Sequence, residues 1–315
     1  MATLSTLGAL IAENVASGAR DLMFRKTDLL QTISAYGGRM ESSNGSAPFK
    51  WVVVTGINAS AGTFVEGQAP GVPGAQTFTK ASLDVFGVEA NWTMTGHSAD
   101  NAAKNGYVDD APGLEEVLGK ADFAKKVEDL ICGSTADQGI ASIVDAGDTY
   151  AGIAPGSVAQ WASVETAVGG ALTMSSIDDL YEALTSASSS GVARGAMPNV
   201  ILAHPKQIKK YSQLAGVAGA ANNSVLVSPD GSKGLDLAFK WAAASYQGIP
   251  LVQIRTLANS ELYMLDMTDF ALIEHRAPRV DVVSTNPELM QWRVSSTMAL
   301  KVEKRSQHGK LTGLT

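Results

Sequence analysis

The stretch PGLEEVLGKADFAKKVEDLIC, residues 112–132, predicts one long helix around which the rest of the chain is organised. Pro112 suits the first turn, because an N–H at that position would have no intrahelical partner. Gly133 follows the last periodic residue, as a helix-ending glycine does. The apolar positions form a wider arc than the single stripe of a surface helix. We therefore expect other elements to cover this helix on more than one side. The arc consists of Leu114, Val117, Leu118, Ala121, Phe123, Ala124, Val127, Leu130 and Ile131.

Before the helix, residues 51–95 predict a long two-stranded excursion with a tip of small residues. Trp51–Ile57 is rich in β-branched residues, and residues 58–75 are almost all small, glycine or proline. Residues 76–95 predict strand again, with a strict alternation of apolar and polar residues from Phe86 onward. An isolated hairpin is marginal in water, so this one must lie on another surface. That surface is either a partner subunit or the domain to which the hairpin belongs.

After the helix, residues 157–285 have mixed helix and strand character. Ser176, with Asp179 three residues later, predicts the start of a helix that ends at Gly191. Pro205 opens another helix, which Gly216 closes. A short buried strand is predicted at residues 199–203, and further strands at 249–254, 261–266 and 270–274, with a loop of small residues at 217–234.

The C-terminal end of the chain has the sequence pattern of a strand, and the N-terminal end has that of a helix. Residues 290–303 alternate strictly between apolar and other side chains, which predicts a strand longer than the usual five or six residues. Residues 1–35 carry leucines and isoleucines at helical spacing. They form either a packed N-terminal helix or an arm that docks on a neighbouring subunit. The long final strand is expected to return to the long helix.

The composition argues against several classes of protein. The 315 residues carry a net charge of −7, which disfavours a protein whose main task is to grip nucleic acid. The single cysteine, Cys132, allows no internal disulfide and is predicted to be buried and inert. We find neither a signal peptide nor a segment apolar enough to span a bilayer, so a soluble intracellular protein without a membrane partner is expected.

The sequence contains none of the common catalytic or nucleotide-binding motifs. The four histidines, at positions 97, 204, 275 and 308, are far apart and lack metal-ligand spacing. The acidic pairs Asp109–Asp110 and Asp178–Asp179 lie at predicted helix starts, where capping accounts for them. We therefore predict no catalytic, cofactor-binding or metal-binding residue, and no enzyme.

The order of these parts, together with several short motifs, resembles the major capsid proteins of tailed bacteriophages. The motifs are TYAGIAP at 149–155 with Trp161, PNVILAHPKQ at 198–207, ASYQGIPLV at 244–252, LYMLDMTDFALIEHR at 262–276, and the terminal strand with Trp292. That family shares its fold with encapsulins and with the floor of the herpesvirus capsid. The similarity extends over nearly the whole chain.

The resemblance implies an α+β fold with the parts of that family. These are an N-terminal arm (1–50), an extended E-loop hairpin (51–95), a peripheral domain with its spine helix (96–156), an α/β axial domain (157–285) and a return strand of the peripheral domain (286–315). Predicted subunit-interface residues are Phe64, Glu66, Pro70, Pro73, Phe78, Lys80, Trp92 and Trp292. Some family members cross-link an E-loop lysine to a neighbour, but no motif here matches the partner that Lys80 would need.

The function implied is that of a structural shell protein. Hexamers and pentamers would form an icosahedral shell around double-stranded DNA, without sequence-specific contacts. The partners implied are a scaffolding protein, a portal and decoration proteins. The chain would assemble in the host cytoplasm and become part of the virion capsid.

Two alternatives stay open at this point. The first is an encapsulin-like compartment, which has the same fold but encloses an enzyme. The second, from another class, is a small-molecule-binding α/β enzyme built on residues 157–285, although the sequence offers no set of convergent polar groups for it.

Overall fold

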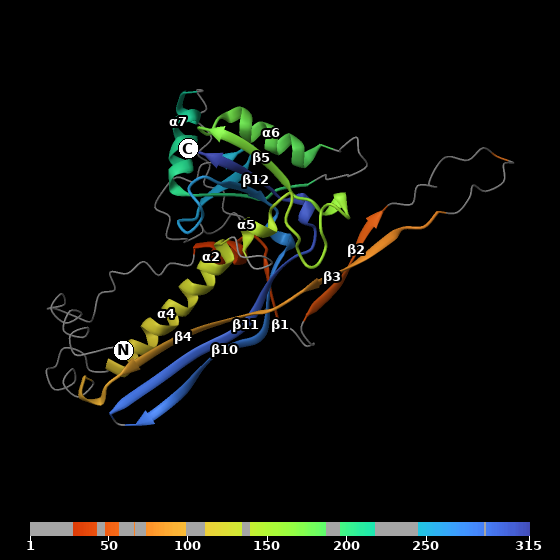
Figure 1. Ribbon diagram of the computed structural model, residues 1–315. Coiled ribbons are helices and arrows are strands. Elements are labelled where there is room, and N and C mark those ends of the chain that lie inside the picture. Colours follow the sequence, from red (N-terminus) through yellow and green to blue (C-terminus); the bar gives the residue numbers. More distant parts are fainter. Residues whose placement is uncertain are drawn as a thin grey trace.

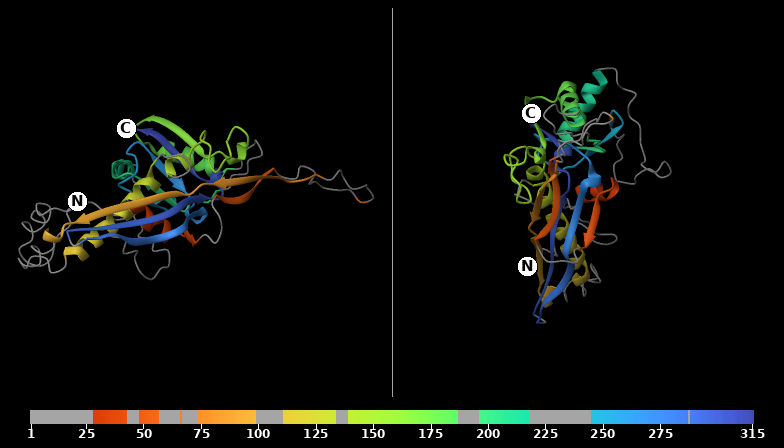
Figure 2. Two further views of the ribbon diagram at one scale, coloured as in Figure 1. Left: turned by 60° about the horizontal axis from the view of Figure 1, so that its bottom comes forward. Right: turned by 90° about the vertical axis from the view of Figure 1, so that its right-hand side faces the viewer.

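Two sheets and a projecting hairpin form the framework of the computed structural model (Figure 1). The structure describes residues 28–42, 48–56, 66, 74–98, 111–133, 139–186, 196–217, 245–286 and 288–315. We call the four-stranded sheet the long sheet and the six-stranded sheet the compact sheet. Figures 1 and 2 show the hairpin reaching away from both sheets.

The long sheet has the strand order β1-β10-β11-β4. One of its two inner strands, β11 (Leu289–Val302), is the predicted terminal strand, which is confirmed. This strand runs antiparallel to both of its neighbours, and β1 joins the edge in parallel to β10. The other bounds are β1 (Arg39–Ser42), β10 (Phe270–Asn286) and β4 (Phe86–Met94).

Helix α4, Ala111–Cys132, lies along the long sheet and confirms the predicted helix, starting one residue earlier (Figure 1). It contacts β4 and β11, and also the short helices α2 (Asp28–Ala35) and α5 (Ile140–Ile143). Phe123 and Val127 are buried against these neighbours. The expected cover on more than one side is therefore present. Val117 departs from the predicted arc, because its side chain is 63% exposed.

Helix α2 is fastened to α4 by one buried carboxylate. The Leu29 N–H donates to Glu128 Oε1 at 2.6 Å, and the Leu30 N–H donates to Oε2 at 3.0 Å. Glu128 is fully buried, and this burial raises the pKa of its carboxyl, although the two N–H groups act in the opposite direction. The carboxylate thus satisfies two of the N–H groups that a helix start leaves unpaired.

The compact sheet has the order β5-β12-β9-β6-β8-β7. Its strands are β5 (Val164–Gly170), β12 (Gly309–Leu314), β9 (Leu262–Leu265), β6 (Val200–Ala203), β8 (Ile249–Gln253) and β7 (Ser245–Tyr246). Helix α6 (Met174–Thr185) packs on β5 and β12, and helix α7 (Pro205–Val217) packs on β6 and β8. The helix predicted to open at Pro205 is confirmed, whereas Gly191 and most of the loop 217–234 lie outside the described residues.

The predicted start of α6 was wrong by three residues. Thr173 is the N-cap, and Ser176 occupies the third helical position of a capping box. The Ser176 N–H donates to Thr173 Oγ1 at 3.1 Å, and the Thr173 N–H donates to Ser176 Oγ at 3.3 Å. The usual third residue of a capping box is Glu or Gln, but a serine hydroxyl fills the same role here.

Strand β10 is much longer than the predicted strand at 270–274. It continues to Asn286, with a register shift between Arg276 and Arg279 that leaves one extra residue on β10. Pro278 lies within this shift, where its missing N–H removes no regular ladder bond. Its long ladder with β11 places β10 in the long sheet.

The predicted boundary at residues 285 and 286 differs from the sheet topology. Strand β10 belongs to the long sheet, although it fell within the predicted axial range, and β12 returns to the compact sheet from the predicted peripheral range. Residues 262–276 and the terminal segment each cross from one sheet to the other. Their local patterns predict strands but not the partners with which those strands pair.

Two passages of the chain between the sheets meet at Arg305, which is fully buried. Its guanidinium donates to the carbonyl oxygens of Ile143 and Asp148, both at 2.6 Å, and of Asp145 at 2.8 Å. Arg305 belongs to the 3₁₀ turn η3 (Arg305–Gln307), which lies between β11 and β12, and the three carbonyls lie between α4 and β5, in the passage that also contains η1 (Ala159–Trp161). A third passage contains η2 (Met267–Asp269), and Asp269 Oδ1 lies 3.7 Å from Lys304 Nζ.

The predicted hairpin is shorter than residues 51–95. Strand β2 (Phe49–Gly56) pairs with β3 (Thr77–Leu83), but the chain then leaves for the long sheet, where β4 pairs with β11. The strand predicted at 76–95 is therefore two strands that meet at residues 84–85. The alternation predicted from Phe86 is confirmed by the burial pattern of β4.

Candidate assembly surface

The base of the β2–β3 hairpin is anchored on the body of the subunit. Ala81 and Leu83 are fully buried, and the Ser82 N–H donates to the Ala151 carbonyl at 2.8 Å. The Trp51 ring lies 6.5 Å from the Tyr150 ring, measured between centroids. One face of the hairpin base is thus covered by its own chain, which fixes the direction in which the strands project.

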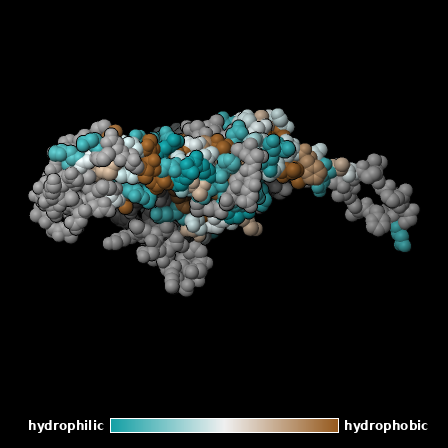
Figure 3. All heavy atoms as spheres, turned by 90° about the horizontal axis from the view of Figure 1, so that it is seen from below, coloured by the Kyte–Doolittle hydropathy of each residue, from teal (hydrophilic) through white to brown (hydrophobic). Residues whose placement is uncertain are grey.

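The opposite face of the hairpin carries apolar side chains that no other part of the described chain covers. Val52, Val54 and Phe78 are 66%, 54% and 62% exposed, and we call these three residues the bare face. Val54 lies directly opposite Phe78 in the antiparallel register, and Val52 lies two residues before Val54. Side chains of directly opposed residues share a face, so the three are neighbours. Figure 3 shows hydrophobic surface on the part of the hairpin that leaves the body.

Basic residues border the bare face. Lys80 lies opposite Val52, and Lys50 lies opposite Ser82, which places both lysines on the same side of the hairpin as the bare face. Both lysine side chains are exposed. A complementary surface would therefore be apolar with acidic groups at its edge.

Covering the bare face would release appreciable free energy. A Val or Phe side chain contributes roughly 1.5–3 kcal/mol when it is moved from full exposure to full burial. These three residues start more than half exposed, so a neighbouring surface could gain a substantial part of that amount from each. Exposed apolar side chains that cluster in this way mark interaction surfaces in soluble proteins.

The predicted interface residues fall into three groups. Phe78 and Lys80 lie on the hairpin, on the side of the bare face, and Glu66 is exposed. Phe64, Pro70 and Pro73 lie outside the described residues. Trp92 and Trp292 are cross-strand partners in the long sheet, with stacked rings 6.4 Å apart. The structure thus brings the two tryptophans together, but on a different sheet from Phe78.

Trp92 already has a partner within its own chain. It is only 9% exposed, and α4 covers its ring at Gly119. A Cβ atom at position 119 would lie 2.5 Å from that ring, so glycine permits the close approach. In the described structure the Trp92 ring serves the packing between β4 and α4. Trp292 is half-buried beside it.

Val52 and Val54 were missed among the candidate interface residues. The segment Lys50–Gly56 has apolar residues on both faces of the strand, so alternation did not distinguish the covered face from the exposed one. Only the pairing with β3 and the packing of Trp51 settle this. Val282 and Val283, near the end of β10, are also more than half exposed and were not predicted.

Several side chains of types that often serve in catalysis have structural roles here. The Lys206 N–H donates to His204 Nδ1 at 3.2 Å, which caps α7, and the Tyr246 hydroxyl donates to Asp178. Cys132 is buried, and this burial raises the pKa of its thiol. Within the described ranges, no group of three or more His, Cys, Asp and Glu side chains is arranged to hold a metal ion. The helices of that same part of the chain include none with the length and apolarity needed to cross a membrane.

Comparison with known proteins gives one family and several similar structures. The model of a family described as SU10 major capsid protein matches residues 91–315. No curated protein sequence matches the chain.

Three solved structures illustrate the likeness in fold. A chain of the cyanophage A-1(L) capsid asymmetric unit is 15% identical with a TM-score of 0.70, over 96% of this chain and 97% of that one. The holo-SrpI encapsulin of Synechococcus elongatus PCC 7942 is 15% identical with a TM-score of 0.61, over 98% and 95%. The capsid of a native GTA particle is 14% identical with a TM-score of 0.62, over 100% and 99%.

Proposed function

The chain belongs to the SU10 major capsid protein family and is a capsid shell protein, and from this premise we propose that it assembles as hexamers and pentamers into an icosahedral shell enclosing double-stranded DNA. The bare face of the hairpin is the single observation that carries the proposal. Val52, Val54 and Phe78 are exposed on a projection whose other face is anchored. A neighbouring subunit would supply the missing cover.

A projecting hairpin suits a ring of subunits. In a heterologous contact, the hairpin of each subunit lies on a different surface of the next one, and the ring closes if the rotation is right. Several modest contacts per subunit then act together, so the shell is stable although each contact is weak. The lysines beside the bare face would select a neighbour whose receiving surface is acidic at its edge.

The remaining partners follow from the same proposal. A net charge of −7 suits a shell that encloses DNA without gripping it. We expect a scaffolding protein and a portal to act during assembly in the host cytoplasm, and decoration proteins to bind the finished shell. The predicted interface residues Phe64, Glu66, Pro70, Pro73, Phe78 and Lys80 belong to this proposed hairpin contact.

The proposal is tested by making the bare face polar. The double variant Val54→Ser/Phe78→Ser should fold as the wild type does but assemble poorly, as judged by light scattering and negative-stain microscopy. Met197→Ser is the matched control, because Met197 is 84% exposed and lies away from the hairpin, next to the compact sheet. Wild-type shells from the double variant would overturn the role of the bare face.

A deletion of residues 58–75 tests the same contact at the tip. The deleted chain should give a folded subunit that forms few or no shells. Normal shells from this deletion would argue against a contact made by the hairpin.

An encapsulin-like compartment is the second candidate, favoured by the fold shared with the Synechococcus encapsulin. The two candidates differ in what the particle encloses. Particles purified from the natural source should contain DNA if the chain forms a phage head, and a cargo protein if it forms a compartment. The family match favours the phage head.

A further inference from the structure

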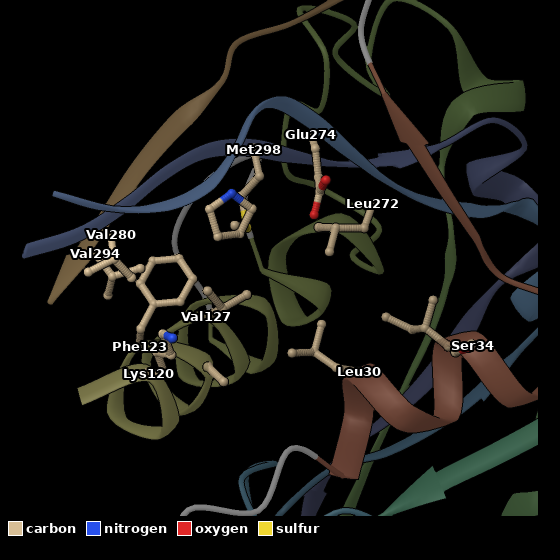
Figure 4. A pocket seen from close by; sticks show the side chains of 13 residues that line it. Leu30, Ser34, Lys120, Phe123, Val127, Leu272, Glu274, Val280, Val294 and Met298 are labelled. Carbon is tan, nitrogen blue, oxygen red and sulfur yellow. The ribbon is translucent and has the colours of Figure 1, made fainter. Parts of the chain in front are cut away.

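An apolar groove opens between α2, α4 and the long sheet, with a volume of about 370 Å³ (Figure 4). Leu30 and Ile33 line it from α2, and Phe123 and Val127 line it from α4. Val294 and Met298 form part of the wall on the sheet. Figure 4 shows these side chains converging from three elements on one space. The groove belongs to the body of the subunit and does not include the bare face.

The groove leaves the packing of α2 incomplete. The first turn of this helix is fixed to α4 through Glu128, and Ile33 is buried. Leu30 nevertheless faces the space between the elements (Figure 4), and Ile33 also lines it. Close packing is the rule in protein interiors, so an apolar space of this size beside a short helix calls for an occupant.

The chain before α2 is the nearest candidate. The hydrogen bonds from Leu29 and Leu30 to Glu128 place the start of α2 beside α4, which is also one wall of the groove. Leu22, Met23 and Phe24 precede Asp28 by four to six positions. An extended chain of that length reaches about 13–22 Å, enough to return to a groove that begins at Leu30.

Charge also suits this segment. Arg25 and Lys26 follow the three apolar residues. Glu274 and Lys120 both line the groove, and Lys120 is already paired with Glu116 at 2.6 Å. A basic residue beside Phe24 could therefore pair with Glu274 while the apolar side chains fill the space. A short tether keeps the segment at an effective concentration in the millimolar range, so weak apolar contacts suffice for docking.

We propose that this groove is the docking site of the chain's own segment Leu22–Phe24, which folds back across α2 and completes the packing between α2, α4 and the long sheet. The docked segment would fix the start of the N-terminal region on its own subunit. Residues further toward the N-terminus would then be free to reach a neighbour.

Disulfide trapping in the full-length, unassembled subunit tests the proposal. Met23→Cys combined with Ala124→Cys should form an intrachain bond, seen as a shifted monomer on a non-reducing gel, because Ala124 lines the groove. Met23→Cys with Val294→Cys is a second pair, which keeps the test valid if the first variant folds poorly. Ser5→Cys with Ala124→Cys is the control and should react far more slowly. A covalent dimer would assign the groove to a second copy, and no trapping in either pair would leave it without this occupant; both results overturn the proposal.

A fluorescent apolar dye gives an independent measurement. The triple variant Leu22→Ser/Met23→Ser/Phe24→Ser should vacate the groove and bind the dye several-fold more than the wild type. Adding Ala124→Phe, which fills the groove from α4, should abolish the extra binding. Equal dye binding by the wild type and the triple variant would overturn the proposal. Neither experiment requires assembly, so failure here is distinguishable from failure of the shell proposal.

Discussion

Strands β3 and β4 follow each other in the chain, yet β3 leaves a large apolar side chain in solvent and β4 buries its apolar face. Phe78 on β3 is 62% exposed, whereas Trp92 on β4 is 9% exposed. Only Asp84 and Val85 separate the two strands. In β4, Trp92 shares its face with Phe86, Val88 and Met94, whereas in β3 Phe78 shares its face with Lys80. The two faces also differ in what covers them, which is a property of distant parts of the chain.

The cover over β4 comes from α4, and that over β3 is partial. Gly119 lets the helix backbone approach the Trp92 ring, and β11 pairs along the whole of β4. Among the described residues strand β3 pairs with β2 alone, and its covered side chains, Ala81 and Leu83, are at the base. An uncovered two-stranded sheet is marginal in water, so the hairpin depends on its anchor until a neighbour covers it.

The largest expected effect on stability comes from removing the buried tryptophan of β4. Trp92→Ala should lower the free energy of unfolding of the subunit by about 3–5 kcal/mol, because it removes a large buried ring and leaves a cavity under α4. Phe78→Ala is the matched control, expected to change the same quantity by no more than about 0.5 kcal/mol. Urea unfolding measures both free energies when it is monitored by far-UV circular dichroism, a signal that does not require the tryptophan. Similar losses in the free energy of unfolding for the two variants would contradict the difference between the covered β4 and the exposed β3.

The second effect tests how α2 is held on the other side of α4. Glu128→Ala leaves the N–H groups of Leu29 and Leu30 unpaired, which should cost about 1–3 kcal/mol in the free energy of unfolding. Glu128→Gln keeps one of the two acceptor oxygens and removes a buried charge, but its NH2 group cannot accept from the second N–H, so it should lose less stability at neutral pH than Glu128→Ala. Hydrogen exchange should quicken at both residues 29 and 30 in the alanine variant and at only one of them in the glutamine variant. Equal exchange in all three proteins would show that the carboxylate does not hold α2.

The pH dependence of the same pair follows from the direction of the shift. Burial raises the pKa of Glu128 in the folded state above the ordinary value of 4.5, so the folded state binds the proton more readily than the unfolded state. The stabilising contribution is fully present below 4.5 and is lost as the pH rises through the raised value. The wild type should therefore gain stability relative to Glu128→Gln as the pH falls toward 4.5. An unchanged difference between the two proteins would contradict the buried carboxylate.

The smallest expected effect on subunit stability comes from a conservative substitution within the bare face. Val54→Thr keeps the β-branched shape, so the free energy of unfolding should change by no more than about 0.5 kcal/mol. Losing one buried methyl group per contact, about 0.8 kcal/mol, should raise the protein concentration needed for assembly at least about fourfold. Light scattering across a dilution series measures this concentration. Thr79→Val, which changes the opposite face of the hairpin, is the matched control. An unchanged concentration for Val54→Thr would mean that Val54 stays uncovered in the shell.

The elements that depend on local pattern could be predicted from the sequence. The helical arc between Pro112 and Cys132 and the alternation of the terminal strand each contain enough periodic residues to decide the type of element. The course of β10 through Pro278 could not be predicted, because a bulge opposite β11 accommodates the proline. The return of β12 to the compact sheet was also missed, since strand pairing between distant segments leaves no local mark.

Only part of the candidate assembly surface could be predicted from the sequence. Phe78 and Lys80 were predicted because they belong to a projecting hairpin, and they lie on the side of the bare face. Trp92 was proposed for the same interface as a large aromatic residue, but the small size of Gly119, 27 positions away, lets α4 cover it. The sequence could not show which face of Lys50–Gly56 is anchored, because that depends on Trp51 meeting Tyr150.

The hold of Arg305 on a second chain passage has a mechanical consequence. A load that tilts the compact sheet against the long sheet strains the bonds between one guanidinium and the carbonyls that it binds. Such a joint resists small torques with several short bonds at once and yields when they part together. Arg305 therefore contributes to the stiffness of the subunit, and with it to the curvature that a lattice of subunits can tolerate.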